Sequence, residues 1–232
     1  MRETSFLEIY PSSFSSREDI MTMVLLNVRS LVKHTLDIIS DSVLNSVDSL
    51  FFTETQLTSE PSEILKQNFE PFELSANNTS QHKYSNLALA YRRPLSLLQT
   101  ESFPGISIYA LSKPCFSFNL NVMLIYRQQT MSHENFLYTI QHVRDQFDKT
   151  IHIIMGDLNV DSIENPDNFV SRFLVDYRLI NTEPTHISGS LIDHVYIHET
   201  LGRVCDVITE VHKVYFSDHD AVMIRLKALN NN

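Results

Sequence analysis

Cysteine and glycine are scarce in this chain of 232 residues, which holds two cysteines, four glycines and no tryptophan. Cys115 and Cys205 lie far apart and form no CxxC pair, so the sequence encodes neither a disulfide framework nor a thiolate zinc site. We therefore expect an intracellular protein in a reducing compartment. Because glycines are so few, Gly156 and Gly189, which fall beside candidate site residues, indicate tight turns or close backbone approaches there.

Long apolar runs and positive charge are scarce as well. No stretch of about 18 apolar residues occurs, and residues 1–14 lack the apolar segment of a signal peptide, so we expect neither a membrane span nor a membrane partner. The 28 Asp and Glu residues outnumber the 18 Lys and Arg residues, which gives a formal net charge of −10. Such a chain repels polyanions as a whole, so any binding to nucleic acid must be local or assisted by a metal ion.

The apolar content of 43% is high enough to exclude intrinsic disorder and to form a core. We expect one domain over residues 21–228, preceded by an irregular, Ser-rich leader at residues 1–20 and followed by a short tail at residues 229–232. No internal repeat divides this range.

Short apolar runs and helical periodicities alternate along the chain and predict a mixed α/β fold. A helix capped by Ser30 is expected from the helical spacing of Val32, Leu36, Ile39 and Val43. Strands in the middle of the chain lie between prolines and are expected to be mostly antiparallel. The other expected elements are strands at 22–27, 49–53, 86–91, 106–111, 116–126, 151–155, 191–197, 204–211 and 221–226, helices around 136–147 and 170–177, and a polar loop at 75–85.

Polar side chains follow several of the predicted strands at the point where each strand ends. Because open α/β sheets present their ligand sites at the carboxyl ends of strands, these side chains are candidates for a shared site. They are Asn27, Glu54, Tyr126, and Asp157 with Asn159, and two later groups add Asp193 within Leu191-Ile-Asp-His-Val-Tyr-Ile197 and the pair Asp218-His219. Each residue alone also suits a turn or a solvated strand end, so only the combination indicates function.

This candidate set is rich in oxygen ligands and contains no thiol. Carboxylate and amide oxygens suit Mg²⁺ or Mn²⁺, which keep several waters and bind a substrate phosphate. A zinc site is the alternative, because His194 and His198 have the i, i+4 spacing that binds zinc on a helix. The residues between them favour a strand, in which positions four apart are about 13 Å apart and cannot share one ion.

Six motifs occur in an order that resembles the endonuclease/exonuclease/phosphatase superfamily, the deoxyribonuclease I-like fold. The similarity runs from about Met23 to Leu226. The resemblance implies a four-layer α/β sandwich, in which two packed mixed β-sheets are flanked by helices. The motifs are Leu-Leu-Asn27-Val-Arg-Ser-Leu, Phe-Phe-Thr-Glu54-Thr-Gln-Leu, Leu-Ile-Tyr126-Arg, Met-Gly-Asp157-Leu-Asn159, Leu-Ile-Asp193-His-Val-Tyr-Ile and Ser-Asp218-His219-Asp-Ala-Val.

The resemblance also implies a role for each matched residue. Glu54 would hold the divalent ion, with Asn27 and Asp218 helping directly or through water. Asp157 would orient or deprotonate the attacking water, and Asn159 would position the water or the phosphate.

His219, oriented by Asp193, would donate a hydrogen bond to a non-bridging phosphate oxygen, and Tyr126 would add another. Within the superfamily, the motifs around Asn27 and Glu54 are most similar to endonucleases of mobile elements, namely non-LTR retrotransposons and helicase-linked rolling-circle transposons. The resemblance therefore implies a Mg²⁺- or Mn²⁺-dependent phosphodiesterase that nicks DNA in the nucleus. Other domains of a larger polyprotein would be further partners.

Two alternatives stay open at this point. One is a phosphomonoesterase or phospholipid phosphodiesterase of the same superfamily, which the loops at 75–105 and 180–190 would distinguish from a nuclease. The other is a catalytically inactive binding domain, which is disfavoured because every matched position holds a competent residue type. If DNA is the substrate, local affinity is expected from the arginines Arg29, Arg92, Arg93 and Arg127.

Overall fold

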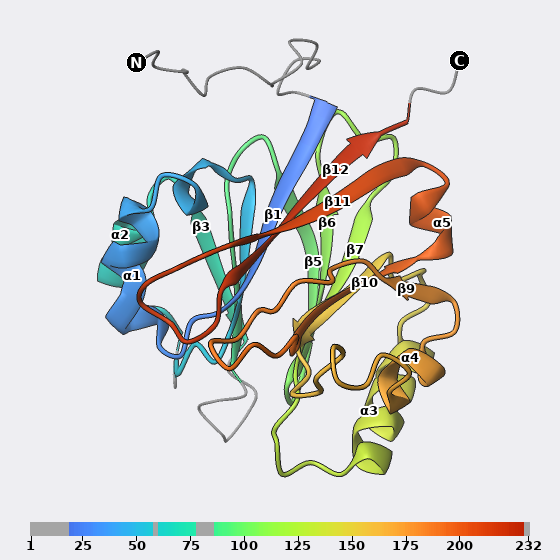
Figure 1. Ribbon diagram of the computed structural model, residues 1–232. Helices are drawn as coiled ribbons and strands as arrows, with labels where there is room; N and C mark the ends of the chain where they lie inside the picture. Colours follow the sequence, from blue (N-terminus) through green and yellow to red (C-terminus); the bar gives the residue numbers. More distant parts are fainter. Residues whose placement is uncertain (1–18, 58–59, 78–85, 230–232) are drawn as a thin grey trace, which may run out of the picture.

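Two six-stranded β-sheets pack face to face in the computed structural model, which describes residues 19–57, 60–77 and 86–229 (Figure 1). Most of the expected leader and most of the tail therefore lie outside the described residues. The first sheet has the order β11 (Cys205–His212), β12 (Ala221–Ala228), β1 (Ile20–Asn27), β2 (Ser49–Thr53), β4 (Leu87–Tyr91) and β3 (Glu73–Asn77). The second has the order β5 (Ser96–Phe103), β6 (Ile106–Ser112), β7 (Leu120–Tyr126), β8 (Ile153–Asp157), β10 (Asp193–His198) and β9 (Tyr177–Leu179).

Both sheets are mixed, because each contains one parallel pair among antiparallel ones. The parallel pairs are β1 with β2 and β7 with β8, and each pair is joined by a segment that contains a helix. The middle strands β3 to β7 pair only antiparallel with one another, as the sequence predicts. The helical segments are α1 (Leu31–Ser40), the 3₁₀ turn η2 (Leu44–Ser46), α2 (Glu63–Asn68), α3 (His133–Gln146), α4 (Phe169–Phe173) and α5 (Glu199–Gly202).

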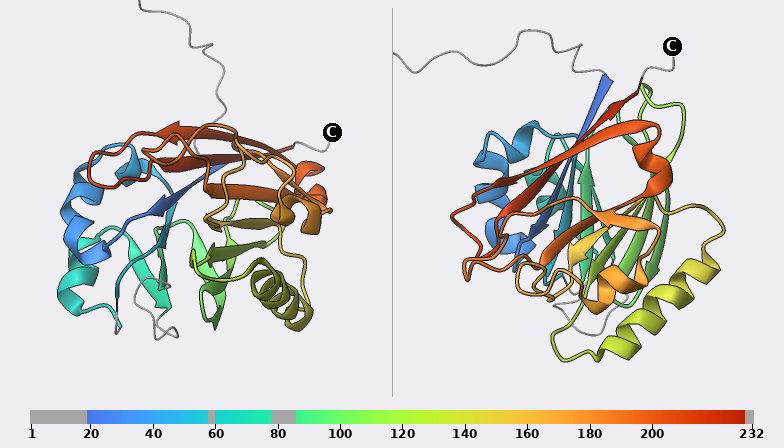
Figure 2. Two further views of the ribbon diagram at one scale, coloured as in Figure 1. Left: turned by 60° about the horizontal axis from the view of Figure 1, so that its bottom comes forward. Right: turned by 45° about the vertical axis from the view of Figure 1, so that its right-hand side comes forward.

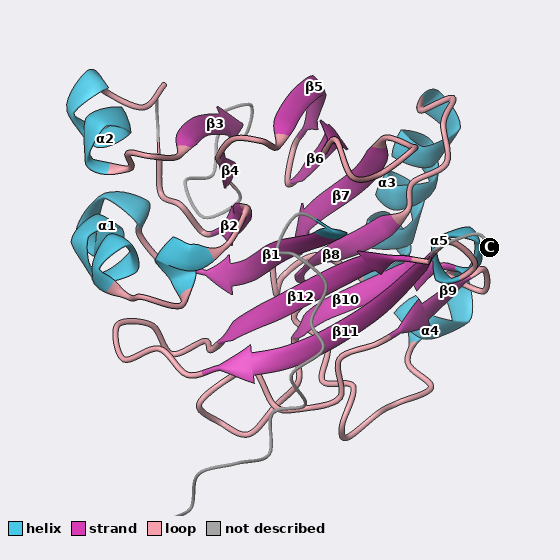
Figure 3. Cartoon of the chain, turned by 90° about the horizontal axis from the view of Figure 1, so that it is seen from above, coloured by secondary structure: helices cyan, strands magenta, loops and turns pink. Residues whose placement is uncertain are grey.

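Alternating side chains along the strands sort the apolar residues into separate cores. Along β1, Met23 and Leu25 join a core that contains residues of both sheets, whereas Val24 and Leu26 pack in another core with residues of α1 and α2. A third core joins the outer face of the second sheet to α3 and α4. Figures 2 and 3 show the resulting four layers, with α1 and α2 on one side and α3 and α4 on the other. The four-layer α/β sandwich is therefore confirmed.

The buried face of α1 differs from the one that the sequence predicts. Ser30 is the N-cap, as expected, but Val32 is 63% exposed and Leu36 is 70% exposed. The helix instead buries Leu31 and Ile38. Leu31 is held close to the sheet because its N–H donates to the carbonyl of Thr55, and this tertiary contact sets the rotation of the helix. The spacing of apolar residues alone could not show that rotation.

Other differences are at element boundaries. The strand expected at 116–126 begins at Leu120, and the helix expected around 170–177 ends at Phe173, after which Tyr177 starts β9. Residues 75–77, expected in a loop, belong to β3, and the rest of that loop, residues 78–85, lies outside the described residues. The short or exposed elements α2, β3 and β5 were not predicted, because they lack a strong apolar period. Within the described residues, no helix has the length and apolar character needed to cross a membrane.

Gly156 in β8 is a position that only glycine fits. Its φ is +150°, and an added Cβ would lie 1.8 Å from the carbonyl oxygen of Ile125 on the paired strand β7. The next residue is Asp157, so this close approach of two strands positions a candidate site residue.

We expect Gly156→Ala to lower the free energy of unfolding by about 2–4 kcal/mol, because the strands must separate to admit the methyl group. Urea unfolding of the whole chain measures the change. Gly202→Ala is the matched control, since an added Cβ there meets nothing within 4 Å. Equal losses in the two variants would contradict a steric origin at Gly156.

Candidate active site

Three neighbouring strands of the second sheet place Tyr126, Asp157 and Asp193 side by side. Tyr126 on β7 is in register with Asp157 on β8, and Asp157 is in register with Asp193 on β10. All three continue the inward-facing alternation that begins with core residues such as Met155 and Val195. The row of side chains that forms the core between the sheets therefore ends in three polar groups.

The first sheet contributes the opposite row. Asn27 ends β1 beside Thr53, and Glu54 follows β2 directly. Asp218 and His219 lie just before β12, which is antiparallel to β1 and so begins at the same end of the sheet. The six motifs of the sequence are thus brought together at one end of the two sheets.

Asn27 joins the two rows. It is fully buried, and its amide nitrogen donates to Glu54 Oε1 at 3.0 Å and to Asp157 Oδ2 at 2.9 Å. Its amide oxygen accepts the N–H of Arg29 at 3.2 Å. Asn27 therefore connects two carboxylates that would otherwise repel each other.

His219 is paired with Asp193, as the sequence predicts. The distance from His219 Nδ1 to Asp193 Oδ2 is 2.7 Å, and both side chains are buried. Burial lowers the pKa of His219, but the charge and hydrogen bond of Asp193, with the charges of Asp157 and Asp218, raise it more, to about 9. His219 is thus protonated at neutral pH, and its Nε2–H is available for a phosphate oxygen.

Asp157 and Tyr126 lie in the most enclosed part of the site. Burial raises the pKa of Asp157, and the charge of Asp193 raises it further, against the opposing effects of His219 and Asn27. A carboxyl group with a raised pKa is suited to accept a proton from water near neutral pH. Burial also raises the pKa of Tyr126, so its phenol stays protonated and can donate a hydrogen bond.

Three non-glycine residues that line the site have left-handed backbone conformations: Arg29 (φ +56°), Glu54 (φ +50°) and Asn159 (φ +50°). Such conformations cost about 1–3 kcal/mol each and persist only where the surroundings enforce them. The Glu54 turn is held by Asn86, whose carbonyl accepts the N–H of Thr55 and whose side chain donates to the carbonyl of Leu57. Strained backbone conformations thus occur at residues whose side chains line the site.

Arg127 fixes the turn that carries Asn159. Its guanidinium donates to the carbonyls of Leu158, Asn159 and Met131, and the side chain of Asn159 donates back to the carbonyl of Arg127 at 2.7 Å. Arg127 is buried, so it is not available to bind DNA, contrary to the expectation from the sequence.

Arg92 and Arg93 lie away from the site. They follow β4, whose end lies beside the start of β2, whereas the site is at the other end of β2. Arg92 donates to the carbonyls of Asn45 and Ser46. Among the four arginines proposed from the sequence, only Arg29 lines the site.

A polar pocket of about 430 Å³ lies between the two rows. Asp193 and Asp218 differ from ordinary surface acids, because one carboxylate oxygen of each, Oδ1, is buried without a hydrogen-bond partner among the described residues. An excess of carboxylate oxygens with unused lone pairs fits a hard divalent cation. The pocket is lined by Arg29, Glu54, Gln129, Asp157, Asn159, Asp161, His186, Ser188, Ser190, Ile192, Asp218 and His219.

His186 is a site residue that the sequence analysis missed. Its Nε2 is 3.7 Å from Asp218 Oδ2, and its ring packs edge-on against His219. It lies in the loop between β9 and β10, which runs beside the loop before β12 in Figure 1 and forms an isolated bridge with His219. No periodicity marks such a loop, so only its position next to the Asp193 motif could have signalled a role.

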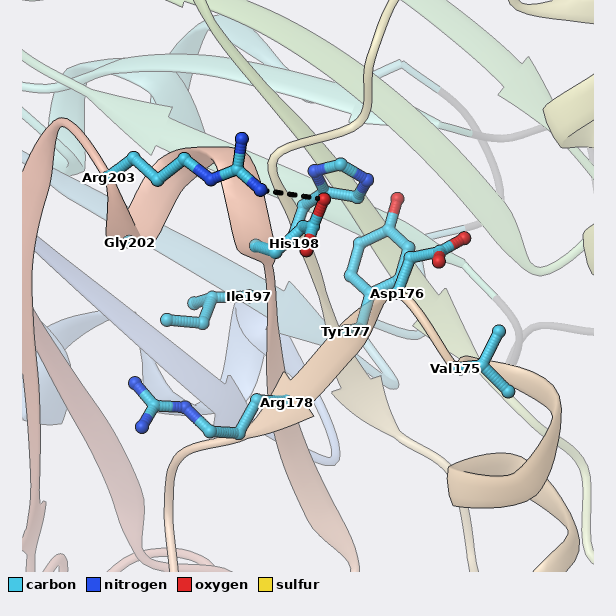
Figure 4. A pocket seen from close by; sticks show the side chains of 9 residues that line it. Val175, Asp176, Tyr177, Arg178, Ile197, His198, Gly202 and Arg203 are labelled. Carbon is cyan, nitrogen blue, oxygen red and sulfur yellow. Dashed lines mark hydrogen bonds and ion pairs between the residues drawn. The ribbon is translucent and has the colours of Figure 1, made fainter.

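The alternative zinc pair does not form. His194 and His198 are both on the strand β10, where His194 contacts the carbonyls of Val160 and Leu191 and His198 caps α5. A second hollow of about 390 Å³ beside β9 and α5 is lined by His198 but by none of the residues of the six motif positions (Figure 4). Its charged side chains are of both signs and indicate no ligand class.

Several solved structures have a similar fold. A scan of protein-family models finds no match, and a search of curated proteins finds none either. The endonuclease domain of TRAS1, a telomere-specific non-LTR retrotransposon, has a TM-score of 0.70 at 16% identity, over 90% of this chain and 99% of that domain. An endonuclease/exonuclease/phosphatase family protein from Bacteroides thetaiotaomicron has a TM-score of 0.67 at 13% identity, over 92% and 96%. A mannosyl-6-phosphatase from the same bacterium has a TM-score of 0.66 at 12% identity, over 89% and 99%.

The His219–Asp193 pair makes a prediction about pH. The pKa of His219 is higher in the folded chain than its ordinary value of about 6.5, so protonation of His219 stabilises the fold. This stabilisation is complete below about pH 6.5 and is lost as the pH rises through about 9. In Asp193→Asn, the pKa of His219 should fall by about one unit or more, because burial then acts with less opposition. Nuclear magnetic resonance of the His219 ring during a pH titration measures this. Asp206→Asn, which removes an exposed carboxylate, is the control and should leave the midpoint in place.

Proposed function

The chain has the deoxyribonuclease I-like fold of the endonuclease/exonuclease/phosphatase superfamily, and on this premise we propose that it is a divalent-metal-dependent phosphodiesterase that nicks DNA. The observation that carries the proposal is that residues of five of the six motifs line one polar pocket, while Tyr126 of the remaining motif lies in register with Asp157. The pocket has carboxylates on one side and His219, paired with Asp193, on the other. A cation site next to a hydrogen-bond donor is an arrangement that binds a phosphate.

Glu54 and Asp218 are the residues that would hold Mg²⁺ or Mn²⁺. When bound, the ion would neutralise phosphate charge and the leaving oxygen. Asn27 presents its amide nitrogen to the carboxylates in this structure, so we assign it to orienting Glu54 and Asp157 and to binding the ion through water.

Asp157 and Asn159 would act on the attacking water. Asp157 accepts its proton, for which a carboxyl with a raised pKa is suited. The turn around Asn159 is fixed by Arg127 and by the bond from Gln129 to Asn159 Oδ1, so Asn159 is preorganised to position the phosphate or the water.

His219 and Tyr126 would stabilise the phosphate as negative charge builds up. His219 donates from Nε2 while Asp193 holds Nδ1, and Tyr126 donates from its phenol. Asp193 contacts no reacting atom in this scheme and is a positioning residue.

The preference for DNA rests on the motifs around Asn27 and Glu54, which resemble mobile-element endonucleases, and on the similarity to the TRAS1 domain. We propose that the chain acts on chromosomal DNA in the nucleus as part of a mobile element, with further domains of a polyprotein supplying much of the affinity. The net charge of −10 supports this division, because one arginine at the pocket cannot by itself give strong binding to DNA.

We expect supercoiled plasmid to become open-circular in the presence of Mg²⁺ or Mn²⁺ and to stay intact in EDTA. Agarose gels at low ionic strength measure the conversion, since weak electrostatic binding is least screened there. Parallel assays use mannose 6-phosphate and sphingomyelin. Hydrolysis of either compound without nicking would replace the proposal by the alternative of a phosphomonoesterase or phospholipid phosphodiesterase. Inactivity in all three assays would favour a catalytically inactive binding domain.

Glu54→Gln should slow nicking about a hundredfold or more, because the amide is a much weaker ligand for a hard cation. The free energy of unfolding should change by less than about 0.5 kcal/mol, since glutamine keeps an oxygen for Asn27 and removes a charge from an acidic cluster. Plasmid nicking and urea unfolding measure the two effects. Glu63→Gln on α2 is the control and should change neither. A Glu54 variant that loses stability but keeps its rate would show that Glu54 is structural.

A further inference from the structure

Arg29 lines the active-site pocket but has no role in the mechanism above. We propose that Arg29 is a phosphate-binding residue that is held by Asp218 when no divalent ion is bound and becomes available to the substrate when the ion takes Asp218. This inference rests on the proposed function and adds an order of events to it. It predicts that the ion and the Arg29–Asp218 pair exclude each other.

The first support is the ion pair itself. Arg29 Nη1 donates to Asp218 Oδ2, across 189 positions of sequence, and joins the end of β1 to the start of β12. Asp218 is one of the two carboxylates assigned to the ion, and its other oxygen, Oδ1, has no hydrogen-bond partner among the described residues. Asp218 therefore pairs with the Arg29 guanidinium in this structure and would also be a ligand of the divalent ion.

The second support is the place of the guanidinium among the acidic groups. Arg29 lines the same pocket as Asp218 and Glu54, the two carboxylates assigned to the ion, and the charges of both raise the pKa of Arg29. Among the described residues, it is the only lysine or arginine that lines the pocket. Its guanidinium thus adds a positive charge to that of His219 within the acidic cluster.

The third support is the backbone at Arg29. The residue has a φ of +56°, and its N–H is held by Asn27 Oδ1 at 3.2 Å. This strained conformation directs the side chain toward the pocket rather than along β1, and such strain is kept where the surroundings require it.

Release from Asp218 would leave the guanidinium facing the substrate. The side chain of Arg29 is 55% exposed at the mouth of the pocket, so it can turn without unpacking the core. Its planar fork of donors matches two oxygens of one phosphate, a contact that lysine makes less well. The same arginine can therefore neutralise the empty site and bind the phosphate in the loaded one.

The test measures Mn²⁺ binding without substrate, from the loss of the free Mn²⁺ signal in electron paramagnetic resonance. Arg29→Gln should bind Mn²⁺ about three- to tenfold more tightly than the parent chain, because the guanidinium no longer competes for Asp218. Lys33→Gln is the matched control. It makes the same charge change on the exposed face of α1, where Lys33 makes no contact with the site, and should leave the affinity close to that of the parent chain.

A second measurement addresses the phosphate. With Mn²⁺ at a saturating level, Arg29→Gln should raise the KM for nicking about tenfold or more with a smaller change in kcat, and Arg29→Lys should recover part of the loss. Calorimetric titration with inorganic phosphate gives the same comparison without any turnover. The affinity of the Mn²⁺-loaded chain for phosphate should fall in Arg29→Gln by a similar factor.

The outcomes separate this inference from the proposed function. If the parent chain binds no Mn²⁺, both fail. If it binds Mn²⁺ and Arg29→Gln binds it no more tightly than Lys33→Gln does, the exclusion between ion and arginine is wrong and the proposed function stands. Tighter Mn²⁺ binding with unchanged phosphate affinity would show that Arg29 only fills the empty site, which overturns its role toward the substrate.

Discussion

The alternation of side chains along paired strands is the constraint on which the site depends. Every second residue of β1, β7, β8 and β10 faces the opposite sheet and is apolar except at the end of the strand next to the site. Asn27, Tyr126 and Asp157 occupy that position as the last residues of β1, β7 and β8, and Asp193 occupies it as the first residue of the antiparallel strand β10. Because the register of each strand is set by its buried apolar face, a slip by one residue would turn these polar groups outward. The core between the sheets thus positions the site, and the hydrogen bond from Asn27 to Asp157 connects the polar side chains of the two sheets.

Burying so many carboxylates is costly, and the structure shows how the cost is limited. His219 neutralises Asp193, Arg29 neutralises Asp218, and Asn27 donates to Asp157. At the site, Asp193 Oδ1 and Asp218 Oδ1 still lack a hydrogen-bond partner among the described residues. Three of the four described non-glycine residues with positive φ also line the pocket, and such a gathering of strained backbones is expected where a site is preorganised for a ligand rather than for folding.

The sequence was sufficient for most of the buried strands, which follow from local apolar runs. It was also sufficient for the layers and for the polar ends of the motifs, because the order of the motifs resembles a known superfamily. It was insufficient for features set by tertiary contacts. The rotation of α1 depends on a bond from Leu31 to Thr55, and the burial of Arg127 depends on carbonyls of two other turns. The role of His186 depends on the pairing of two loops. None of these contacts has a periodic signature, so a pattern of residue types cannot reveal them.

The acidic character of the chain then has a thermodynamic consequence. Solved structures of the same fold include an endonuclease domain and a phosphatase, so the fold alone does not specify the substrate. On the proposed function, in a chain with a net charge of −10, attraction for a phosphate would arise in the pocket, from the ion, His219 and Arg29. If the ion and Arg29 share Asp218, binding of the ion frees a phosphate ligand, and by linkage a bound phosphate must tighten the ion by the same factor. Ion and substrate would then assemble together, and the empty site would hold neither tightly.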